Sequence, residues 1–266
     1  MSELQRLRDA MRFLTQHLPG ATELAEIAEK GSVVLDSQRK EDADKVLTGK
    51  EDKSYNAAEF QRALDEFRKR NFSNLEIGRL YERYVGYLYE VEDWRVAFTG
   101  VLGGFEDLGR DLVCIRGNEH RIIQAKCWSQ KKQIHEKHIY QLYSTVTHYR
   151  LQYREAMQLQ HGRSKAREIM RKLDINGKLY STTNLSEMAI KVAKHIGIDF
   201  VEEPLVKDYP MIKCNIGKAD NEKRYHLPFD PQYDSIIIGN VKGEFYVRTV
   251  AEAEAKGFRR VGYVLV

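Results

Sequence analysis

The sequence has little of several features that define large classes of proteins. It contains three cysteines in 266 residues, Cys114, Cys127 and Cys214, and no C-x-x-C pair, so neither a zinc finger nor a disulfide framework is indicated. No run approaches the roughly 18 consecutive apolar residues of a membrane helix, and the N-terminal residues lack the apolar core of a signal peptide. We therefore expect a cytoplasmic protein with reduced thiols and no membrane partner.

A strong excess of charge of one sign is also lacking in the chain as a whole. The sequence has 43 Lys and Arg against 39 Asp and Glu, a net charge of +4. The charges are nevertheless segregated, because residues 116–172 carry 13 basic and four acidic side chains, or +9, which leaves −5 for the remainder. Five of the eight histidines fall in the same window. A polyanionic partner is therefore expected at residues 116–172.

Hydrophobic periodicity predicts three regions in the chain. Residues 1–72 form a polar helical region, whose second helix is expected over about 57–70. For residues 73–204 the pattern predicts an α/β domain with a central mixed sheet of four to five strands flanked by helices. A helical insertion is expected within this domain over about 130–176. After a short linker, residues 211–266 predict a small α+β module.

The same patterns predict the individual elements. In the middle region we expect a helix capped at Ser73 or Asn74, strands at 94–98, 111–115 and 121–126, helical structure over 135–172 broken near Gly162, a strand at 178–181, a helix at 186–196 and a strand at 198–202. In the C-terminal module we expect strands at 235–238 and 244–247 and a helix at 250–256.

A two-residue turn sets the geometry of the segment DLVCIRGNEHRIIQAK. Gly117-Asn118 between two apolar runs is a hairpin signal, and the resulting register would place Asp111 directly across from Gln124. Lys126 lies two residues beyond Gln124 and therefore projects from the same face of the strand. A carboxylate, an amide and an ammonium group thus converge on one patch of the predicted sheet.

Such a patch suits a hard divalent cation. Mg²⁺ prefers oxygen ligands and needs only one or two carboxylates from a protein. Asp111, the side-chain oxygen of Gln124 and the backbone carbonyl of Ala125 could supply three ligands. Lys126 could activate an attacking water and stabilise charge on a phosphate.

A further ligand could come from the preceding helix. Glu82 is flanked one turn away on each side by Gly78 and Gly86, which would let this helix lie close to the sheet. Each residue of the set is, taken alone, more often structural, since an Asp can cap a turn, a Gln can bond across a sheet and a Lys is usually solvated. Their convergence beside the basic window favours the metal site.

Four stretches resemble the catalytic domain of Mrr-type restriction endonucleases, within the PD-(D/E)xK nuclease superfamily. They read GRLYERYVGYLYEVEDWRVAFTG, EDLGRDLVCI, RIIQAKCW and KLYSTTNLSEMAIKVAKHIGIDFVEE and span about residues 74–203. The resemblance implies that Glu82 is the helix glutamate, Asp111 the metal-binding aspartate, and Gln124 with Lys126 the Q-x-K motif. Gln124 replaces the commoner acidic residue, which should weaken or reshape metal binding. Gln141 resembles a polar position that supports such sites.

The resemblance also implies a function. We expect a Mg²⁺-dependent DNA endonuclease, with Mn²⁺ able to substitute, that acts in restriction or antiviral defence or, with the same chemistry, in recombination or repair. A homodimer is a further expected partner, because many such nucleases cut both strands as dimers. Two alternatives are a non-catalytic DNA-binding subunit with a decayed metal site, and a component docked to a larger defence complex through its N-terminal helices.

The helical insertion is either a DNA-facing surface or a solvated pair of helices. Basic residues at its start are candidates for DNA contact: Lys131, Lys132, His135, Lys137 and His138. Four tyrosines of the insertion are expected in the core rather than as base-stacking platforms: Tyr140, Tyr143, Tyr149 and Tyr153.

The C-terminal tail resembles a small accessory module attached to various nucleases, with a C-x-I start, a YHLP turn, a GE pair and an EAEAxGxRR end. Arg259 and Arg260 could contact phosphate. Cys214 and His226 are too few for a zinc site, so a packed thiol and a hydrogen-bonded imidazole are expected.

Overall fold

The computed structural model describes residues 57–99, 110–239 and 241–260, which divide into two units. The first unit contains Gly78–Gly86 and the described part of Val96–Leu205, and the second contains residues 57–77, Tyr87–Arg95 and the described part of 206–260. The structure predicted for residues 1–56 lies outside the described residues.

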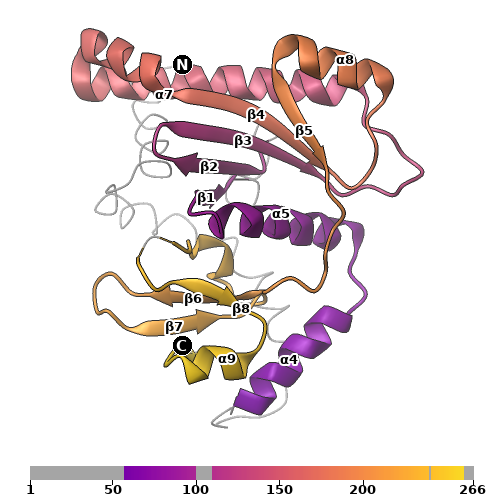
Figure 1. Cartoon of the computed structure of the whole chain (residues 1–266), viewed down its shortest axis with the longest axis vertical. Helices are drawn as coiled ribbons and strands as arrows, with labels where there is room; N and C mark the ends of the chain where they lie inside the picture. The colour runs from indigo at the N-terminus through magenta and orange to yellow at the C-terminus, as the bar shows by residue number, and fades with distance from the viewer. Residues whose placement is uncertain (1–56, 100–109, 240, 261–266) are drawn as a thin grey trace. The chain divides into compact units, whose positions relative to one another are not determined.

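The first unit is built on a five-stranded mixed sheet with the strand order β1-β2-β3-β4-β5. The strands β2 and β3 are antiparallel, whereas β3, β4 and β5 run parallel to one another. Their bounds are β1 (Arg95–Phe98), β2 (Leu112–Arg116), β3 (Glu119–Lys126), β4 (Asp174–Ser181) and β5 (Ile198–Glu202). This topology confirms the predicted mixed sheet (Figure 1).

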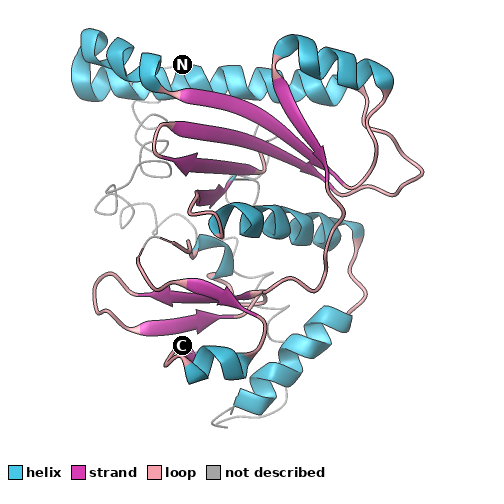
Figure 2. Ribbon diagram, viewed as in Figure 1, coloured by secondary structure: helices cyan, strands magenta, loops and turns pink. Residues whose placement is uncertain are grey.

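Helices cover both faces of this sheet (Figure 2). On one face, α7 (Glu136–Lys172) and α8 (Glu187–Ile196) pack on the strands through a large apolar cluster. The predicted inward row of α7 is buried: Ile139, Leu142, Val146, Tyr149, Tyr153 and Met157. The predicted break occurs at Gly162, whose φ of 79° and ψ of 163° lie outside the helical region.

Two of the four tyrosines that were expected in the core lie at the surface instead. Tyr149 and Tyr153 are buried as predicted, but Tyr140 and Tyr143 are 51% and 43% exposed. The reason is helical spacing, because Tyr140 follows the buried Ile139 by one position and therefore points to a different side of α7. The prediction was wrong for these two residues.

Helix α5 (Asn74–Glu90) contributes its middle to the first unit and both of its ends to the second. It begins at a capping box, in which the Ser73 hydroxyl accepts from the Glu76 N–H and the Glu76 carboxylate accepts from the Ser73 N–H. The predicted cap at Ser73 is therefore confirmed. Tyr81, Tyr84 and Val85 form the buried stripe of α5 within the first unit.

The second unit contains a four-stranded sheet with the order β8-β6-β7-β9. Its strands are β6 (Ile212–Ile216), β7 (Lys223–His226), β8 (Phe245–Val247) and β9 (Arg259–Arg260). Helix α9 (Val250–Ala255) ends before Gly257, which has a φ of 81°. Leu64 of α4 (Ala57–Lys69) packs with this sheet in one apolar cluster.

The strand predicted at 235–238 is absent, and a buried ion pair explains why. Glu90 and Lys213 are both buried, and their carboxylate oxygen and ammonium nitrogen lie 3.7 Å apart. Lys213 donates to the Ile236 carbonyl (2.6 Å), and Glu90 accepts from the Ile238 N–H (3.2 Å) and the Tyr246 hydroxyl. The backbone of Ile236 and Ile238 therefore hydrogen-bonds the two buried charged groups instead of pairing with a neighbouring strand. Tyr233–Ser235, just before it, form a 3₁₀ turn.

Of the two glycines that flank Glu82, only Gly86 lies close to the sheet. A Cβ atom placed on Gly86 would be 2.6 Å from Cζ of Phe98 in β1, whereas a Cβ on Gly78 would meet nothing within 4 Å. The expected close approach of α5 is thus confirmed at one glycine and wrong at the other.

The two glycines form a matched pair for a stability test. Both alanine substitutions gain the same helix propensity, but Gly86→Ala also forces a methyl group into the buried ring of Phe98. We expect the free energy of unfolding of Gly86→Ala to be lower than that of Gly78→Ala by about 1–3 kcal/mol. Urea denaturation followed by circular dichroism measures this difference, and equal free energies would contradict the packing.

Candidate active site

The hairpin of β2 and β3 brings Asp111 to the segment that carries Gln124 and Lys126. Gly117 in its turn has a φ of 60°, a left-handed conformation that glycine adopts without strain. The register runs from Arg116 opposite Glu119 to Leu112 opposite Ile123, as the turn predicted. The C-terminal end of β3, which carries the Q-x-K motif, therefore lies beside the residues that precede β2.

Asp111 is held at this end of the hairpin by two hydrogen bonds. Its backbone N–H donates to the Ile123 carbonyl (2.9 Å), and its carboxylate Oδ2 accepts from the Ala125 N–H (2.6 Å). The regular ladder ends at Leu112, so Asp111 is not the ladder partner of Gln124 that the register suggested. The carboxylate instead lies at the backbone of Ala125, between the two motif side chains.

Gln124 and Lys126 follow the alternation of β3. His120 and Ile122 belong to the face that packs on α7, where His120 is hydrogen-bonded to the Tyr149 hydroxyl (2.9 Å). Gln124 and Lys126 continue the same side of the strand, and Gln124 is fully buried whereas Lys126 is half-buried. These two side chains thus share a face, as predicted from their spacing.

The charge of Lys126 acts on a histidine at the start of α7. Burial lowers the pKa of His138, and the neighbouring ammonium of Lys126 lowers that pKa further. The ring of His138 meets the ring of Trp128 edge to face, with centroids 5.0 Å apart and planes at 84°. Lys126 at the end of β3 therefore lies close enough to the start of α7 for its charge to affect His138.

The donor set fits a hard cation better than zinc. Asp111, Gln124 and Ala125 offer a carboxylate, an amide and a peptide carbonyl, all of which are oxygen ligands of the kind that Mg²⁺ and Mn²⁺ prefer. Glu82 is half-buried on α5. Within the described ranges, no group of three or more His, Cys, Asp and Glu side chains is placed to hold a metal. The predicted set contains only two such residues, so amide oxygens would have to complete it.

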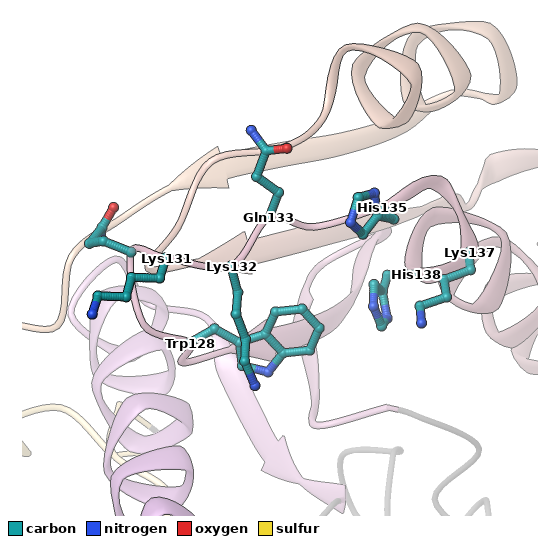
Figure 3. A pocket seen from close by; sticks show the side chains of 8 residues that line it. Trp128, Lys131, Lys132, Gln133, His135, Lys137 and His138 are labelled. Carbon is teal, nitrogen blue, oxygen red and sulfur yellow. The ribbon is translucent and has the colours of Figure 1, made fainter.

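A basic groove of about 530 Å³ opens beside this site (Figure 3). Its lining residues come from the segment after β3 and the first turn of α7: Trp128, Gln130, Lys131, Lys132, Gln133, His135, Lys137 and His138. All five of the residues predicted to contact DNA in the insertion are thus gathered in one place. Trp128 was missed from the sequence, although its position two residues after Lys126 is a signal that could have indicated it.

Three other candidate residues do not line the groove. Gln141 is exposed on α7 and is not among the residues that line the groove. Arg259 is exposed and pairs with Glu222 (2.9 Å). Arg260 is mostly buried, forms an ion pair with Asp230, and places its guanidinium over the ring of Phe60 (5.2 Å). These contacts assign Arg260 to the packing of the second unit.

Cys214 and His226 have structural surroundings. Burial raises the pKa of the Cys214 thiol to about 12 and lowers the pKa of His226 to about 4. The His226 ring is hydrogen-bonded to the Asn215 side chain (2.9 Å). The packed thiol and the bonded imidazole agree with the expectation from the sequence.

A comparison with protein families gives a match over most of the described part of the first unit. The family model of the Mrr catalytic domain, described as a restriction endonuclease, matches residues 77–189. This segment is therefore similar to the catalytic domain of Mrr-type restriction endonucleases. No curated protein and no solved structure gives a significant match to the chain. Among the described helices, none is long and apolar enough to cross a membrane.

The matched segment includes the whole candidate site. Glu82, Asp111, Gln124 and Lys126 all lie within residues 77–189, as does the basic groove. The similarity to a restriction endonuclease domain therefore extends over all the residues of the candidate site. The similarity proposed for the C-terminal module stays a prediction.

One threonine fixes the wall of the groove. The Thr182 hydroxyl accepts from the Trp128 N–H (2.8 Å) and donates to the Trp128 carbonyl (2.7 Å). The Thr182 N–H donates to the Lys126 carbonyl (3.0 Å), and the Thr183 hydroxyl donates to the Lys132 carbonyl. The segment after β3 is therefore held along the end of β4 by its backbone.

Removal of the Thr182 hydroxyl should loosen this wall. Thr182→Val keeps the shape of the side chain but leaves the N–H and carbonyl of Trp128 without their partner, so we expect the free energy of unfolding to fall by about 1–3 kcal/mol. Thr182→Ser keeps the hydroxyl and should retain most of that stability. Chemical denaturation of both variants tests the clamp, and a Val variant as stable as the Ser variant would refute it.

Proposed function

We propose that this chain is a divalent-metal-dependent endonuclease that hydrolyses phosphodiester bonds of DNA. The observation that carries the proposal is the hydrogen bond between the Asp111 carboxylate and the Ala125 N–H, which places a carboxylate within the Q-x-K segment of a domain similar to the Mrr type. Asp111, the Gln124 side-chain oxygen and the Ala125 carbonyl would hold Mg²⁺ or Mn²⁺. Glu82 would join them directly or through a water, with Gln141 in support.

The bound ion would act as a Lewis acid on the phosphoryl oxygens and on a water. Lys126 would orient the attacking water and stabilise the negative charge that develops on the non-bridging phosphate oxygens. The water oxygen forms a new bond to phosphorus, the bond to one bridging oxygen breaks, and the departing oxygen takes up a proton. No covalent intermediate with the protein forms in this scheme.

The basic groove would hold the DNA backbone next to this centre. Lys131, Lys132 and Lys137 are exposed, and their ammonium groups can displace counterions from phosphates, which is the main source of affinity in nonspecific DNA binding. His135 and His138 lie in the same groove and would add contacts to the backbone. Exposed Arg259 could add a phosphate contact from the second unit.

The biological setting follows from the family alone. Restriction or antiviral defence in the cytoplasm is the role that we propose, with a homodimer as the form that would cut both strands. Residues 1–72 would then serve to dock the nuclease to a larger complex.

The catalytic part of the proposal is tested by two substitutions. In plasmid cleavage with Mg²⁺ or Mn²⁺, Asp111→Ala and Lys126→Ala should each reduce the rate about 100-fold or more, because each removes a group that stabilises the transition state. Asp199→Ala and Lys194→Ala, which change exposed residues of β5 and α8, are the matched controls and should leave the rate unchanged.

Cleavage that persists in both site variants would eliminate this site. Salt-sensitive DNA binding without any cleavage, indifferent to metal and to Asp111→Ala, would instead support a non-catalytic DNA-binding subunit.

The groove is tested by the salt dependence of DNA binding. The double variant Lys131→Ala/Lys132→Ala should bind more weakly and should reduce the slope of log affinity against log salt by up to about two, because up to two phosphate contacts are lost. Lys191→Ala/Lys194→Ala removes the same charge from the exposed side of α8. Fluorescence anisotropy at several salt concentrations measures both, and equal slopes for the two variants would place the DNA elsewhere.

A further inference from the structure

The groove contains an aromatic side chain that the proposed hydrolysis does not use. We propose that Trp128 is a stacking platform for one DNA base, so that the domain engages a strand whose base next to the cleaved phosphate is unpaired. This inference rests on the proposed function and specifies its substrate class. The first reason is position, since Trp128 follows Lys126 by two residues and its backbone continues along Thr182.

The surroundings of the indole favour a flat ligand. In Figure 3 the indole is seen face-on, with His138 beside its edge and with Gln133 pointing away from it. The His138 ring stands at 84° to the indole plane, so it supports the indole without stacking on it. The groove extends beside the indole and is lined by lysines that can hold the flanking phosphates.

The ammonium of Lys132 lies over the half-buried indole ring, which also packs against the apolar cluster of the first unit. Its Nζ lies 5.7 Å from the indole centroid, and the side chain is exposed. Such a cation–π contact at an exposed site is worth about a twofold to fivefold factor in an equilibrium constant. A stacked base is worth about 5- to 150-fold, so a base can replace the ammonium, which then remains available for a phosphate.

The platform is also fixed in place before DNA arrives. Because the Thr182 hydroxyl bonds both backbone groups of Trp128, little backbone freedom is lost when a base stacks on the indole. A base inside a duplex does not expose its face, whereas a base in a single strand, a mismatch or a flipped nucleotide does. The chemical class indicated is therefore DNA with an unstacked base at the cleavage position.

Tryptophan fluorescence can test this directly in the full-length protein. The chain has two tryptophans, and Trp94 is only 5% exposed, so Trp128 is the accessible reporter. We expect a single-stranded oligonucleotide, titrated without divalent metal so that it is not cleaved, to quench the emission. Trp128→Phe should abolish the quench and keep most of the affinity, because it retains a ring.

Trp128→Leu separates stacking from simple packing, because it keeps an apolar side chain without a ring. In anisotropy titrations its affinity for single-stranded or mismatched DNA should fall about 5- to 150-fold, whereas its affinity for intact duplex should stay within about twofold. Thermal unfolding of both variants verifies that they are folded.

The outcomes distinguish the two proposals. DNA binding without a change of emission, or equal losses for single-stranded and duplex DNA in Trp128→Leu, would overturn the stacking platform and leave the nuclease proposal intact. The loss of metal-dependent cleavage in Asp111→Ala is independent of both readouts. The absence of any DNA binding would overturn both proposals.

Discussion

The contact between the Asp111 carboxylate and the Ala125 N–H is the interaction on which the rest of the candidate site depends. It joins the residue before β2 to the motif at the end of β3, and it exists because the turn at Gly117 sets the register of the hairpin. A shift of one residue would turn Gln124 and Lys126 to the opposite face. The positions of Asp111, Gln124 and Lys126 are thus set by the strand pairing of the hairpin.

The groove adds a second feature to the candidate site, namely a rigid wall that carries positive charge. The +9 window of the sequence is not spread evenly, because Lys131, Lys132 and Lys137 meet at the start of α7 beside Lys126. The hydroxyl of Thr182 holds the backbone of this wall. Charge attracts DNA without choosing among strands, whereas a fixed aromatic ring can discriminate between stacked and unstacked bases.

Much of this architecture could be predicted from local patterns. The cap at Ser73, the hairpin turn, the break at Gly162 and the mixed sheet follow from signals within a few residues of each other. The predictions failed where distant residues decide. Ile236 and Ile238 resemble a strand, but their backbone serves a buried Glu90–Lys213 pair that no local pattern reveals. Gly78 and Gly86 look equivalent in the sequence, and only the position of Phe98 distinguishes them. The role of Thr182 was invisible for the same reason, because its partner precedes it by more than fifty residues.

That long separation has a consequence for how the domain can vary. The segment after β3 is tied to the end of β4 at both of its ends, by Thr182 near Trp128 and by the bridge between Ile134 and Leu185. Helix α7 begins beside this clamp and ends before Asp174, which pairs with Glu119 at the opposite end of the parallel strands β3 and β4. Between these two points it folds back at Gly162, and residues 159–165 around the fold are exposed. Helical turns can therefore be added or removed around Gly162 without displacing the groove, since loop closure depends only weakly on length. The exposed part of α7 around Gly162 can therefore vary in length while the end of the sheet that carries the candidate site keeps its form.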